Sequence, residues 1–298
     1  MKLLLILFYY YFSWWYRLGK ARTLTVGALK RTYFVYRPKA APPSESLPVV
    51  IAVHGATMNG PLMAWMSQLN GVADREGFLV VYPDGTGSNR SYTWNAGNCC
   101  GDARKNQVDD VGFFRALIAD LAKRDAIDPK RIFVTGISNG AMMTYRIAAE
   151  LAGQIAAIAP VAGPSPPVAT PPSRPMPIIH FHGTMDQFTP YSGGKGPKSL
   201  FQIDYLSVEQ TISMWVLFNQ CRSQPEVTPV KVAEGDLAVT KMTYGNGLAQ
   251  SEVQLFKIDG GGHTWPGRKP LAKIMGPAVL SLSANQLMWQ FFQRHPLP

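Results

Sequence analysis

Short apolar runs alternate along this chain with longer stretches whose apolar residues recur every three or four positions. The runs cover residues 49–53, 78–82, 131–135, 178–181 and 253–258. They are short and rich in β-branched residues, which is typical of strands buried inside a sheet. The stretches at 111–122 and 142–151 have the spacing of amphipathic helices. This alternation predicts an α/β fold with a mostly parallel sheet and helices on both faces.

Size and composition favour one catalytic domain. A chain of 298 residues with 46% hydrophobic content can bury one large core. No repeat and no long linker divides it, although residues 164–177 are rich in proline. We therefore expect a single catalytic domain over residues 22–298, preceded by a hydrophobic segment at residues 1–21.

The N-terminal segment resembles an export signal. Lys2 precedes an apolar and aromatic run over residues 3–16, and Arg17 and Lys20 follow it. The run is short for a membrane-spanning helix, and no small-x-small cleavage site follows it. We expect a secreted, extracellular protein and leave cleavage open. The alternative is an N-terminal helix that packs on the domain.

The formal charge of +10 does not indicate nucleic-acid binding, because the Lys and Arg residues are scattered and do not interleave with aromatic residues. Such a surface would be attracted to anionic wall material instead. Nothing in the sequence implies a stable protein partner. The expected partner is an ester substrate, either free or linked to a polymer.

The three cysteines permit at most one internal disulfide. Cys99 and Cys100 are adjacent, and we hypothesise a vicinal disulfide between them. Two reduced thiols, or a bridge from either one to Cys221, are the alternatives. No His/Cys spacing resembles a zinc site, so we expect no metal.

Ser138 is the candidate nucleophile. It lies in Gly136-Ile137-Ser138-Asn139-Gly140, between the run at 131–135 and the helical stretch that follows. A Gly-x-Ser-x-Gly match alone is weak evidence, but its position between a strand and a helix is that of a nucleophile elbow. Glycines are needed there because the serine backbone is strained and the helix packs closely on the strand. The alternative is a glycine-flanked helix cap.

His263 is the candidate base. A serine hydroxyl needs a histidine to accept its proton, and in this arrangement the chain order is serine, acid, histidine. His263 follows the run at 253–258 in a glycine-rich loop, whereas His54, His180 and His182 precede every plausible acid. His54 is expected to brace its loop by hydrogen bonding. A surface role for His263 is the alternative.

Asp186 is the candidate acid, because it emerges just after the strand at 178–181, at the carboxyl edge of the sheet. It would orient the imidazole and stabilise the imidazolium. Asp259 is the runner-up. The pair Asp109-Asp110 precedes the serine and begins a helix, so helix capping explains it better than catalysis.

The oxyanion of an attacked ester would need fixed N–H donors. We expect the backbone N–H of Asn139, one residue after the nucleophile, and that of Ala56, in the loop after the strand at 49–53. Thr57 is the second choice in that loop and a candidate substrate contact.

Six sequence blocks together are similar to the polyhydroxybutyrate depolymerase and feruloyl esterase-like family of secreted α/β-hydrolase esterases. They are His54-Gly55, residues 94–101, residues 108–111, the serine elbow, residues 182–186 and residues 262–267. The resemblance extends from about residue 22 to the C-terminus and implies the same catalytic residues. In many relatives a cysteine near position 221 has a partner, but the corresponding stretch here, residues 244–247, has none.

These observations predict an α/β-hydrolase fold without a large cap domain and a serine carboxylic-ester hydrolase that works through an acyl-enzyme. No metal or organic cofactor is required for that chemistry. The resemblance implies feruloyl-type, acetyl or short hydroxyalkanoate esters, with a polyhydroxyalkanoate depolymerase as the alternative. An acyltransferase on the same fold and a non-catalytic wall-binding protein are the rivals.

Two tryptophans are candidate walls for the acyl group. Trp265 lies beside the candidate base, and Trp94 lies in the block with the paired cysteines. Trp94 packed in the core is the equal alternative. The stretch between residues 163 and 176 is too short for a helical lid, which predicts an open cleft suited to aromatic-acyl or hydroxyalkanoate esters over long-chain triglycerides.

Overall fold

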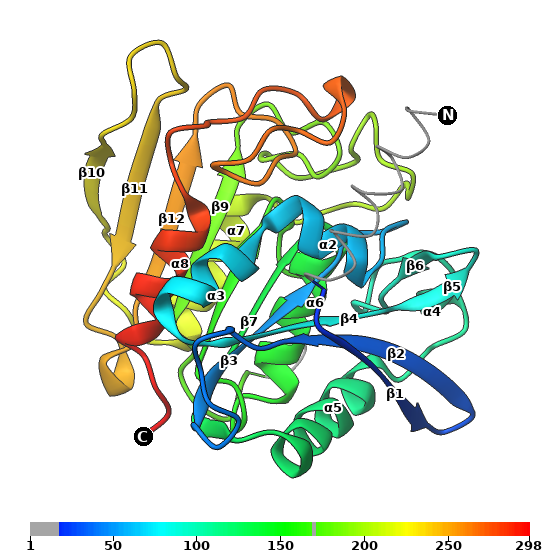
Figure 1. The fold of residues 1–298 in the computed structure, drawn as a ribbon. Helices are drawn as coiled ribbons and strands as arrows, with labels where there is room; N and C mark the ends of the chain where they lie inside the picture. The colour runs from blue at the N-terminus through cyan, green and yellow to red at the C-terminus, as the bar shows by residue number, and fades with distance from the viewer. Residues whose placement is uncertain (1–17, 169–170) are drawn as a thin grey trace, which may run out of the picture.

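The computed structural model describes residues 18–168 and 171–298, and a large twisted sheet forms its centre (Figure 1). The central strands are β4 (Leu79–Pro83), β3 (Leu47–Val53), β7 (Ile127–Ile137), β8 (Ala157–Val161), β9 (Ile178–Gly183) and β12 (Val253–Ile258), and each runs parallel to its neighbours in that group. Antiparallel strands flank them at both edges: β1 (Lys20–Val26), β2 (Leu29–Tyr36), β11 (Val239–Tyr244) and β10 (Glu226–Val230). The ten-stranded order is β1-β2-β4-β3-β7-β8-β9-β12-β11-β10. The predicted mostly parallel sheet is confirmed.

Helices cover both faces of this sheet (Figure 1). One hydrophobic core includes side chains of α5 (Asp110–Arg124), α6 (Asn139–Glu150) and α7 (Val208–Phe218), and the other includes those of α2 (Gly60–Ser67), α3 (Leu69–Glu76) and α8 (Ala284–Gln293). The short elements are β5 (Thr86–Ser88), β6 (Ser91–Thr93), α4 (Gly101–Lys105), η1 (Leu248–Gln250) and η2 (Lys273–Met275). Each of the two hydrophobic cores packs against one face of the sheet. The central strands are therefore buried on both faces, which is why their sequences are continuously apolar.

The apolar runs predicted as strands correspond to β3, β4, β7, β9 and β12, and the two helical stretches correspond to α5 and α6. Strand β8 was missed. Its sequence, Ala157–Val161, contains alanines and a proline, yet every residue in it is buried. Helices α6 and α8 both contact β8, and small side chains allow the close approach of a helix on each face. Intrinsic strand preference does not report that requirement.

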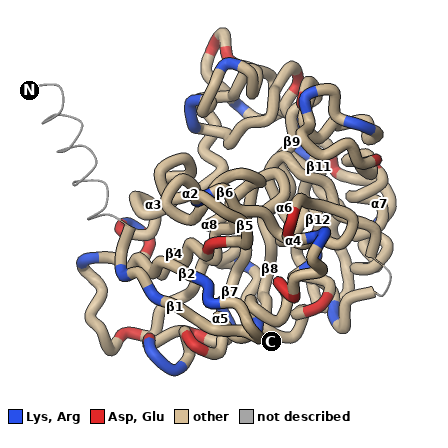
Figure 2. The backbone as a smooth tube through the Cα atoms, turned by 90° about the vertical axis from the view of Figure 1, so that its right-hand side faces the viewer, with Lys and Arg blue, Asp and Glu red and all other residues tan. Residues whose placement is uncertain are grey.

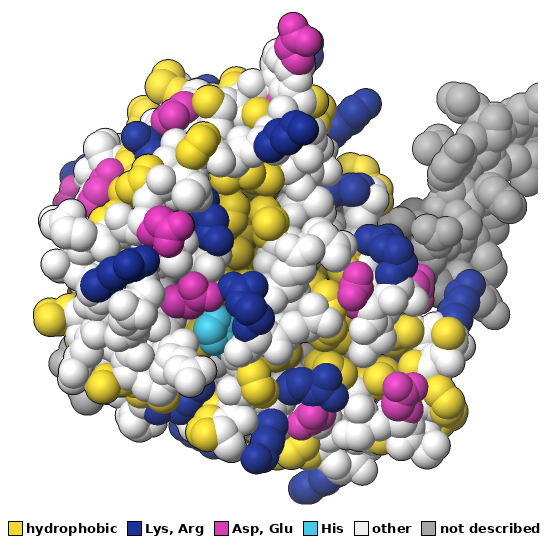
Figure 3. Space-filling model, turned by 90° about the vertical axis from the view of Figure 1, so that its left-hand side faces the viewer, with side chains coloured by type: hydrophobic (Ala, Val, Ile, Leu, Met, Phe, Trp, Pro, Cys, Tyr) yellow, Lys and Arg dark blue, Asp and Glu magenta, His cyan; other side chains and the backbone are white. Residues whose placement is uncertain are grey.

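No helix occupies the described residues between β8 and β9, which agrees with the expected absence of a large cap domain. Within residues 18–168 and 171–298, no helix is long and apolar enough to cross a membrane. The predicted export segment falls mainly outside the described residues. Basic and acidic residues are interspersed along the backbone in Figure 2 and across the face in Figure 3, as expected from their scatter in the sequence.

Candidate active site

Ser138 occupies a sharp turn between β7 and α6. Its backbone has φ 58° and ψ −125°, a conformation that costs energy for a residue with a side chain. A Cβ on Gly140 would lie 2.2 Å from the carbonyl oxygen of Val53, and one on Gly136 would lie 2.5 Å from the carbonyl oxygen of Gly140. Both flanking glycines are therefore needed for the helix to pass this close to the sheet.

His263 and Asp186 meet at the same edge of the sheet. Asp186 follows β9 and His263 follows β12, and these strands are parallel neighbours. Nδ1 of His263 lies 2.7 Å from Oδ2 of Asp186. His263 is 7% exposed and Asp186 is 4% exposed. Because the carboxylate can only accept, it fixes the His263 tautomer with a proton on Nδ1 and leaves Nε2 as the acceptor.

Further donors hold the carboxylate of Asp186 in place. Oδ1 accepts from the backbone N–H groups of Phe188 and Thr189 at 2.8 and 2.9 Å, and the Thr189 hydroxyl lies 3.1 Å from Oδ2. Burial alone would raise the pKa of Asp186, but the nearby His263 and these hydrogen bonds outweigh it and lower the pKa below its usual value. The group is therefore an anion poised to orient and stabilise a cationic imidazole.

A pocket of about 270 Å³ opens at this point, and both Ser138 and His263 line it. Ala56 and Thr57, from the candidate oxyanion loop, and Trp265, the candidate aromatic wall, also line it. Most of the remaining lining is apolar: Met58, Leu62, Met66, Ile137, Met142, Phe188, Leu200, Phe201, Leu271 and Met275. The site can therefore place an apolar group beside a hydroxyl and an imidazole.

The loop after β3 passes next to the candidate nucleophile. A Cβ on Gly55 would lie 3.4 Å from Cβ of Ser138. The N–H of Thr57 is already engaged, because it donates to the carbonyl of Tyr92 at 2.8 Å. In the described chain, the N–H groups of Ala56 and Asn139 donate to no protein acceptor. This geometry favours Ala56 over Thr57 as the loop's oxyanion donor.

His54 braces that loop, the role expected for it. Its Nε2 accepts from the N–H of Gly85 at 2.9 Å, so Nδ1 carries the proton and donates to the carbonyl of Gly55 at 2.7 Å. Complete burial lowers the pKa of His54 to about 3. The imidazole is neutral near pH 7 and ties the loop to the turn after β4.

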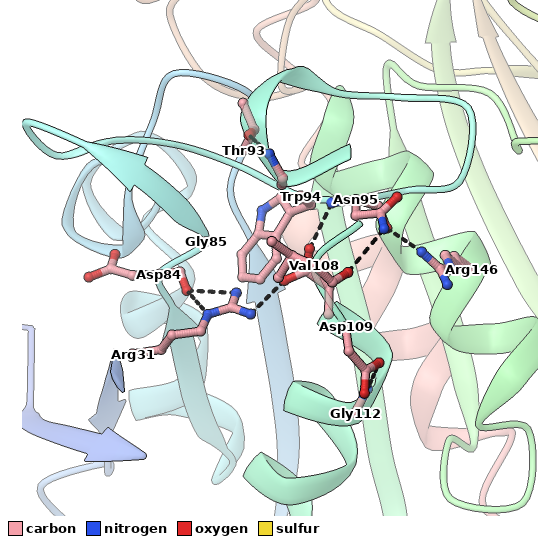
Figure 4. A network of polar contacts seen from close by, with 12 residues as sticks. Arg31, Asp84, Gly85, Thr93, Trp94, Asn95, Val108, Asp109, Gly112 and Arg146 are labelled. Atoms are coloured by element: carbon pink, nitrogen blue, oxygen red, sulfur yellow. Dashed lines mark hydrogen bonds and ion pairs between the residues drawn. The ribbon is translucent and has the colours of Figure 1, made fainter. Parts of the chain in front are cut away.

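A buried ion pair supports the segment beside this loop (Figure 4). Arg31 of β2 donates to Oδ1 of Asp110 and to the carbonyl of Asp84, and its guanidinium lies 3.7 Å from the ring centroid of Phe113. Oδ2 of Asp110 accepts from the backbone N–H of Asn95 at 2.7 Å. Asp110 is thus a buried structural carboxylate, whereas its neighbour Asp109 caps α5 through the N–H of Gly112. Helix capping, which the sequence suggested for the pair Asp109-Asp110, is therefore the role of Asp109 alone.

Trp94 connects this network to the nucleophile elbow. The side chain of Asn139 accepts from the backbone N–H of Trp94 at 2.8 Å and donates to its carbonyl at 3.0 Å. The Trp94 indole is fully buried, donates to the carbonyl of His54 and does not line the pocket. The expectation that Trp94 forms a substrate wall is therefore corrected: it packs in the core and positions Asn139.

Cys99 and Cys100 are paired in a vicinal disulfide, and Cys100 lines the pocket. Cys221 is a free thiol. A Cβ on Gly247 would lie 2.7 Å from its sulfur, so the stretch at 244–247 does face Cys221 but offers it no partner. Among the described residues, no cluster of three or more His, Cys, Asp and Glu side chains is arranged to hold a metal ion.

Sequence reasoning missed much of the pocket wall. Phe188, Phe201 and Tyr205 belong to the segment between Asp186 and α7, and residues 269–275 belong to the loop after the candidate base. Neither segment has the periodicity that identifies an element. The aromatic residues around the candidate acid were the available signal.

Comparison with known proteins places these features in a family. The model of the family described as esterase PHB depolymerase matches residues 31–165. The protein NocK of Nocardia uniformis subsp. tsuyamanensis is 30% identical over 283 residues, which are 90% of this chain and 79% of NocK. Feruloyl esterase B of Piromyces equi is 31% identical over 242 residues. The aligned region covers 78% of this chain but only 42% of that relative. The acetyl xylan esterase from Aspergillus awamori superposes with a TM-score of 0.63 at 17% identity, over 92% of this chain and 99% of that one. The α/β-hydrolase fold class is confirmed.

Proposed function

This chain belongs to the esterase PHB depolymerase family of carboxylic-ester hydrolases, and we propose that it hydrolyses esters with Ser138 as nucleophile, His263 as base and Asp186 as the orienting acid. The observation that carries the proposal is the 2.7 Å contact between His263 and Asp186 beside a pocket that Ser138 also lines.

In the proposed reaction, Oγ of Ser138 attacks the ester carbonyl while Nε2 of His263 accepts its proton. The backbone N–H groups of Ala56 and Asn139 stabilise the negative charge on the carbonyl oxygen. The alcohol leaves with the proton from His263, and a water activated by His263 then hydrolyses the acyl-enzyme. Asp186 remains ionised throughout and stabilises the imidazolium.

For the substrate we propose feruloyl-type, acetyl or short hydroxyalkanoate esters. The apolar pocket, with the rings of Phe188, Phe201 and Trp265, supports a flat aromatic acyl group. A relative is named feruloyl esterase B. The alternative within the family is a depolymerase that hydrolyses polyhydroxyalkanoate, since another relative is named poly(3-hydroxyalkanoate) depolymerase C. Secretion remains part of the proposal because the N-terminal residues resemble an export signal.

The first test is to replace Ser138. Turnover by Ser138→Ala and His263→Ala should fall by roughly three orders of magnitude or more. Ser199 is the matched control, since among the described residues it is the other serine that lines the pocket. A fluorophosphonate should label wild type and Ser199→Ala but not Ser138→Ala. If Ser138→Ala keeps a tenth of wild-type turnover, the assignment is wrong.

The substrate proposal is tested by comparing initial rates on methyl ferulate, a short-chain nitrophenyl ester, a hydroxybutyrate oligomer and emulsified triolein. Faster hydrolysis of triolein than of the other three would refute it. Turnover in water without an added alcohol acceptor separates an esterase from an acyltransferase.

A further inference from the structure

A line of buried polar side chains lies behind the candidate acid, between helix α6 and strand β9. Tyr145 of α6 and His180 of β9 are 0% exposed, and His182 of β9 is 1% exposed. The hydroxyl oxygen of Tyr145 lies 2.8 Å from Nδ1 of His180, and Nε2 of His180 lies 3.1 Å from Nδ1 of His182. The two histidines share one face of β9 because side chains alternate along a strand.

This line ends at the loop that carries Asp186. Nε2 of His182 lies 2.8 Å from the carbonyl oxygen of Thr189 and 3.5 Å from Oδ2 of Asp186. Oδ2 is the oxygen that His263 contacts. The four side chains therefore form one continuous path from the helix of the nucleophile to the acid that orients the base.

The acceptor at the end of the path determines the direction of every hydrogen bond in it. A carbonyl oxygen cannot donate, so Nε2 of His182 carries a proton and donates to Thr189. Burial lowers the pKa of both His180 and His182, so both rings are neutral and each has one bare nitrogen. Nδ1 of His182 thus accepts from Nε2–H of His180, and Nδ1 of His180 accepts from the hydroxyl of Tyr145. All three donors face toward Asp186.

Thr189 transmits this arrangement to the carboxylate. Its backbone N–H donates to Oδ1 of Asp186 at 2.9 Å, and its hydroxyl lies 3.1 Å from Oδ2 and 3.0 Å from the carbonyl of Ala162. Because His182 binds the carbonyl of the same residue, a change at His182 would move the backbone that presents those donors. The N–H of His182 also presents its partial positive charge to Oδ2 from 3.5 Å.

We infer that Tyr145, His180 and His182 act together as positioning residues that hold Asp186, through Thr189, in register with His263. The inference rests on the proposed function of the Ser138, His263 and Asp186 set. None of the three contacts substrate in the proposed reaction. Their effect is therefore expected on kcat, which depends on the alignment of the base, and not on KM.

Tyr145→Phe tests the far end of the path, because it removes the hydroxyl and leaves Nδ1 of His180 without its donor. Tyr82→Phe is the matched control: Tyr82 is also 0% exposed, and its hydroxyl donates to Oδ1 of Asn70 at 2.7 Å, away from the pocket. Both variants should melt at a lower temperature than wild type. Tyr145→Phe should lower kcat about 3- to 10-fold at unchanged KM, whereas Tyr82→Phe should keep kcat within about twofold.

His182→Gln and His182→Asn test the near end. The longer Gln side chain can bring an amide N–H to the position of Nε2 and donate to Thr189, whereas Asn reaches only the position of Nδ1. His182→Gln should retain kcat within about threefold of wild type, and His182→Asn should lose roughly tenfold or more. A role in packing alone predicts equal losses of kcat in both variants.

Ser138→Ala, measured in the same assay, separates the two proposals. If Ser138→Ala is inactive while Tyr145→Phe and both His182 variants keep wild-type kcat, the positioning role is refuted and the proposed function stands. Equal losses in the Gln and Asn variants would also refute the positioning role. Turnover by Ser138→Ala would instead refute the proposed function.

Discussion

Replacing Asp110 with asparagine would leave Arg31 in the core without a counter-ion. Arg31 is 4% exposed and Asp110 is 0% exposed, and Nη1 of Arg31 lies 2.5 Å from Oδ1 of Asp110. Asparagine has nearly the same shape as aspartate, but it has only one acceptor oxygen, which can still accept from the N–H of Asn95. Asp110→Asn therefore removes the charge and the hydrogen bond that Arg31 donates to Oδ1.

The cost follows from how completely the pair is buried. Removing one partner of a buried ion pair costs about 3–5 kcal/mol, because the remaining charge has neither water nor its partner. Arg31 keeps its two hydrogen bonds to the carbonyl of Asp84 and its contact with the Phe113 ring, which favours the lower half of that range. For a domain of about 280 residues, 3 kcal/mol corresponds to a fall in Tm of roughly 5 °C.

Urea denaturation followed by far-UV circular dichroism measures this loss. The informative companion is the double variant Arg31→Met/Asp110→Asn, which removes both charges and should recover about half of the lost stability or more. Glu226→Gln, at an exposed pair with Arg222, should cost less than about 1 kcal/mol. If Asp110→Asn lowers the free energy of unfolding by less than about 1 kcal/mol, the pair does not stabilise the site as argued.

Three further predictions concern other sites. Gly140→Ala should lower the free energy of unfolding by about 2–3 kcal/mol and abolish fluorophosphonate labelling, because its Cβ would lie 2.2 Å from the carbonyl oxygen of Val53. Gly153→Ala is the control: its Cβ would meet nothing within 4 Å, so stability and labelling should change little. Burial alone would raise the pKa of Glu252, but its contacts with His295, Arg294 and Gln254 outweigh it and lower the pKa from 4.5 to about 2. The stabilisation is therefore present above about pH 4.5 and lost as the pH falls toward 2, so Glu252→Gln should cost about 1–2 kcal/mol at pH 7, after discounting for solvent exposure, and almost nothing at pH 2. A pH-independent cost would contradict this sign. Alkylation under denaturing, non-reducing conditions should label Cys221 alone, and labelling of all three thiols would exclude the Cys99–Cys100 bridge.

The sequence was informative at positions where the local turn and the parallel sheet both restrict which residue can be present. Ser138, Asp186 and His263 each follow a strand predicted from its apolar run, and parallel strands bring their carboxyl ends to one edge. Glycine at positions 136 and 140 marked the turn because any side chain there would collide with the backbone. Fold class and the candidate chemistry could both be predicted for this reason.

The roles of Trp94 and Asp110 could not be predicted in the same way. Trp94 lies in a loop, and Asp110 lies at the start of a helix. Each has a partner that is distant in the sequence: Asn139 for Trp94 and Arg31 for Asp110. An aromatic residue in a glycine-rich block fits a substrate wall as well as a core position. An aspartate before a helix fits a cap as well as a buried ion pair. Only the fold determines which group is near.

The same distinction explains why reaction type is easier to predict here than substrate. The candidate reacting groups lie at strand ends and in short turns with strict steric limits, so their spacing in the sequence is constrained. The pocket walls instead come from the segment between Asp186 and α7 and from the loop at 269–275, where length and composition can change without disturbing the sheet. Phe188 contributes both to the positioning of the candidate acid and to the pocket wall. Its backbone N–H donates to Asp186 while its ring lines the pocket and lies 5.0 Å from the ring of His263. A substitution at Phe188 would therefore change the pocket wall while the backbone donor to Asp186 is retained.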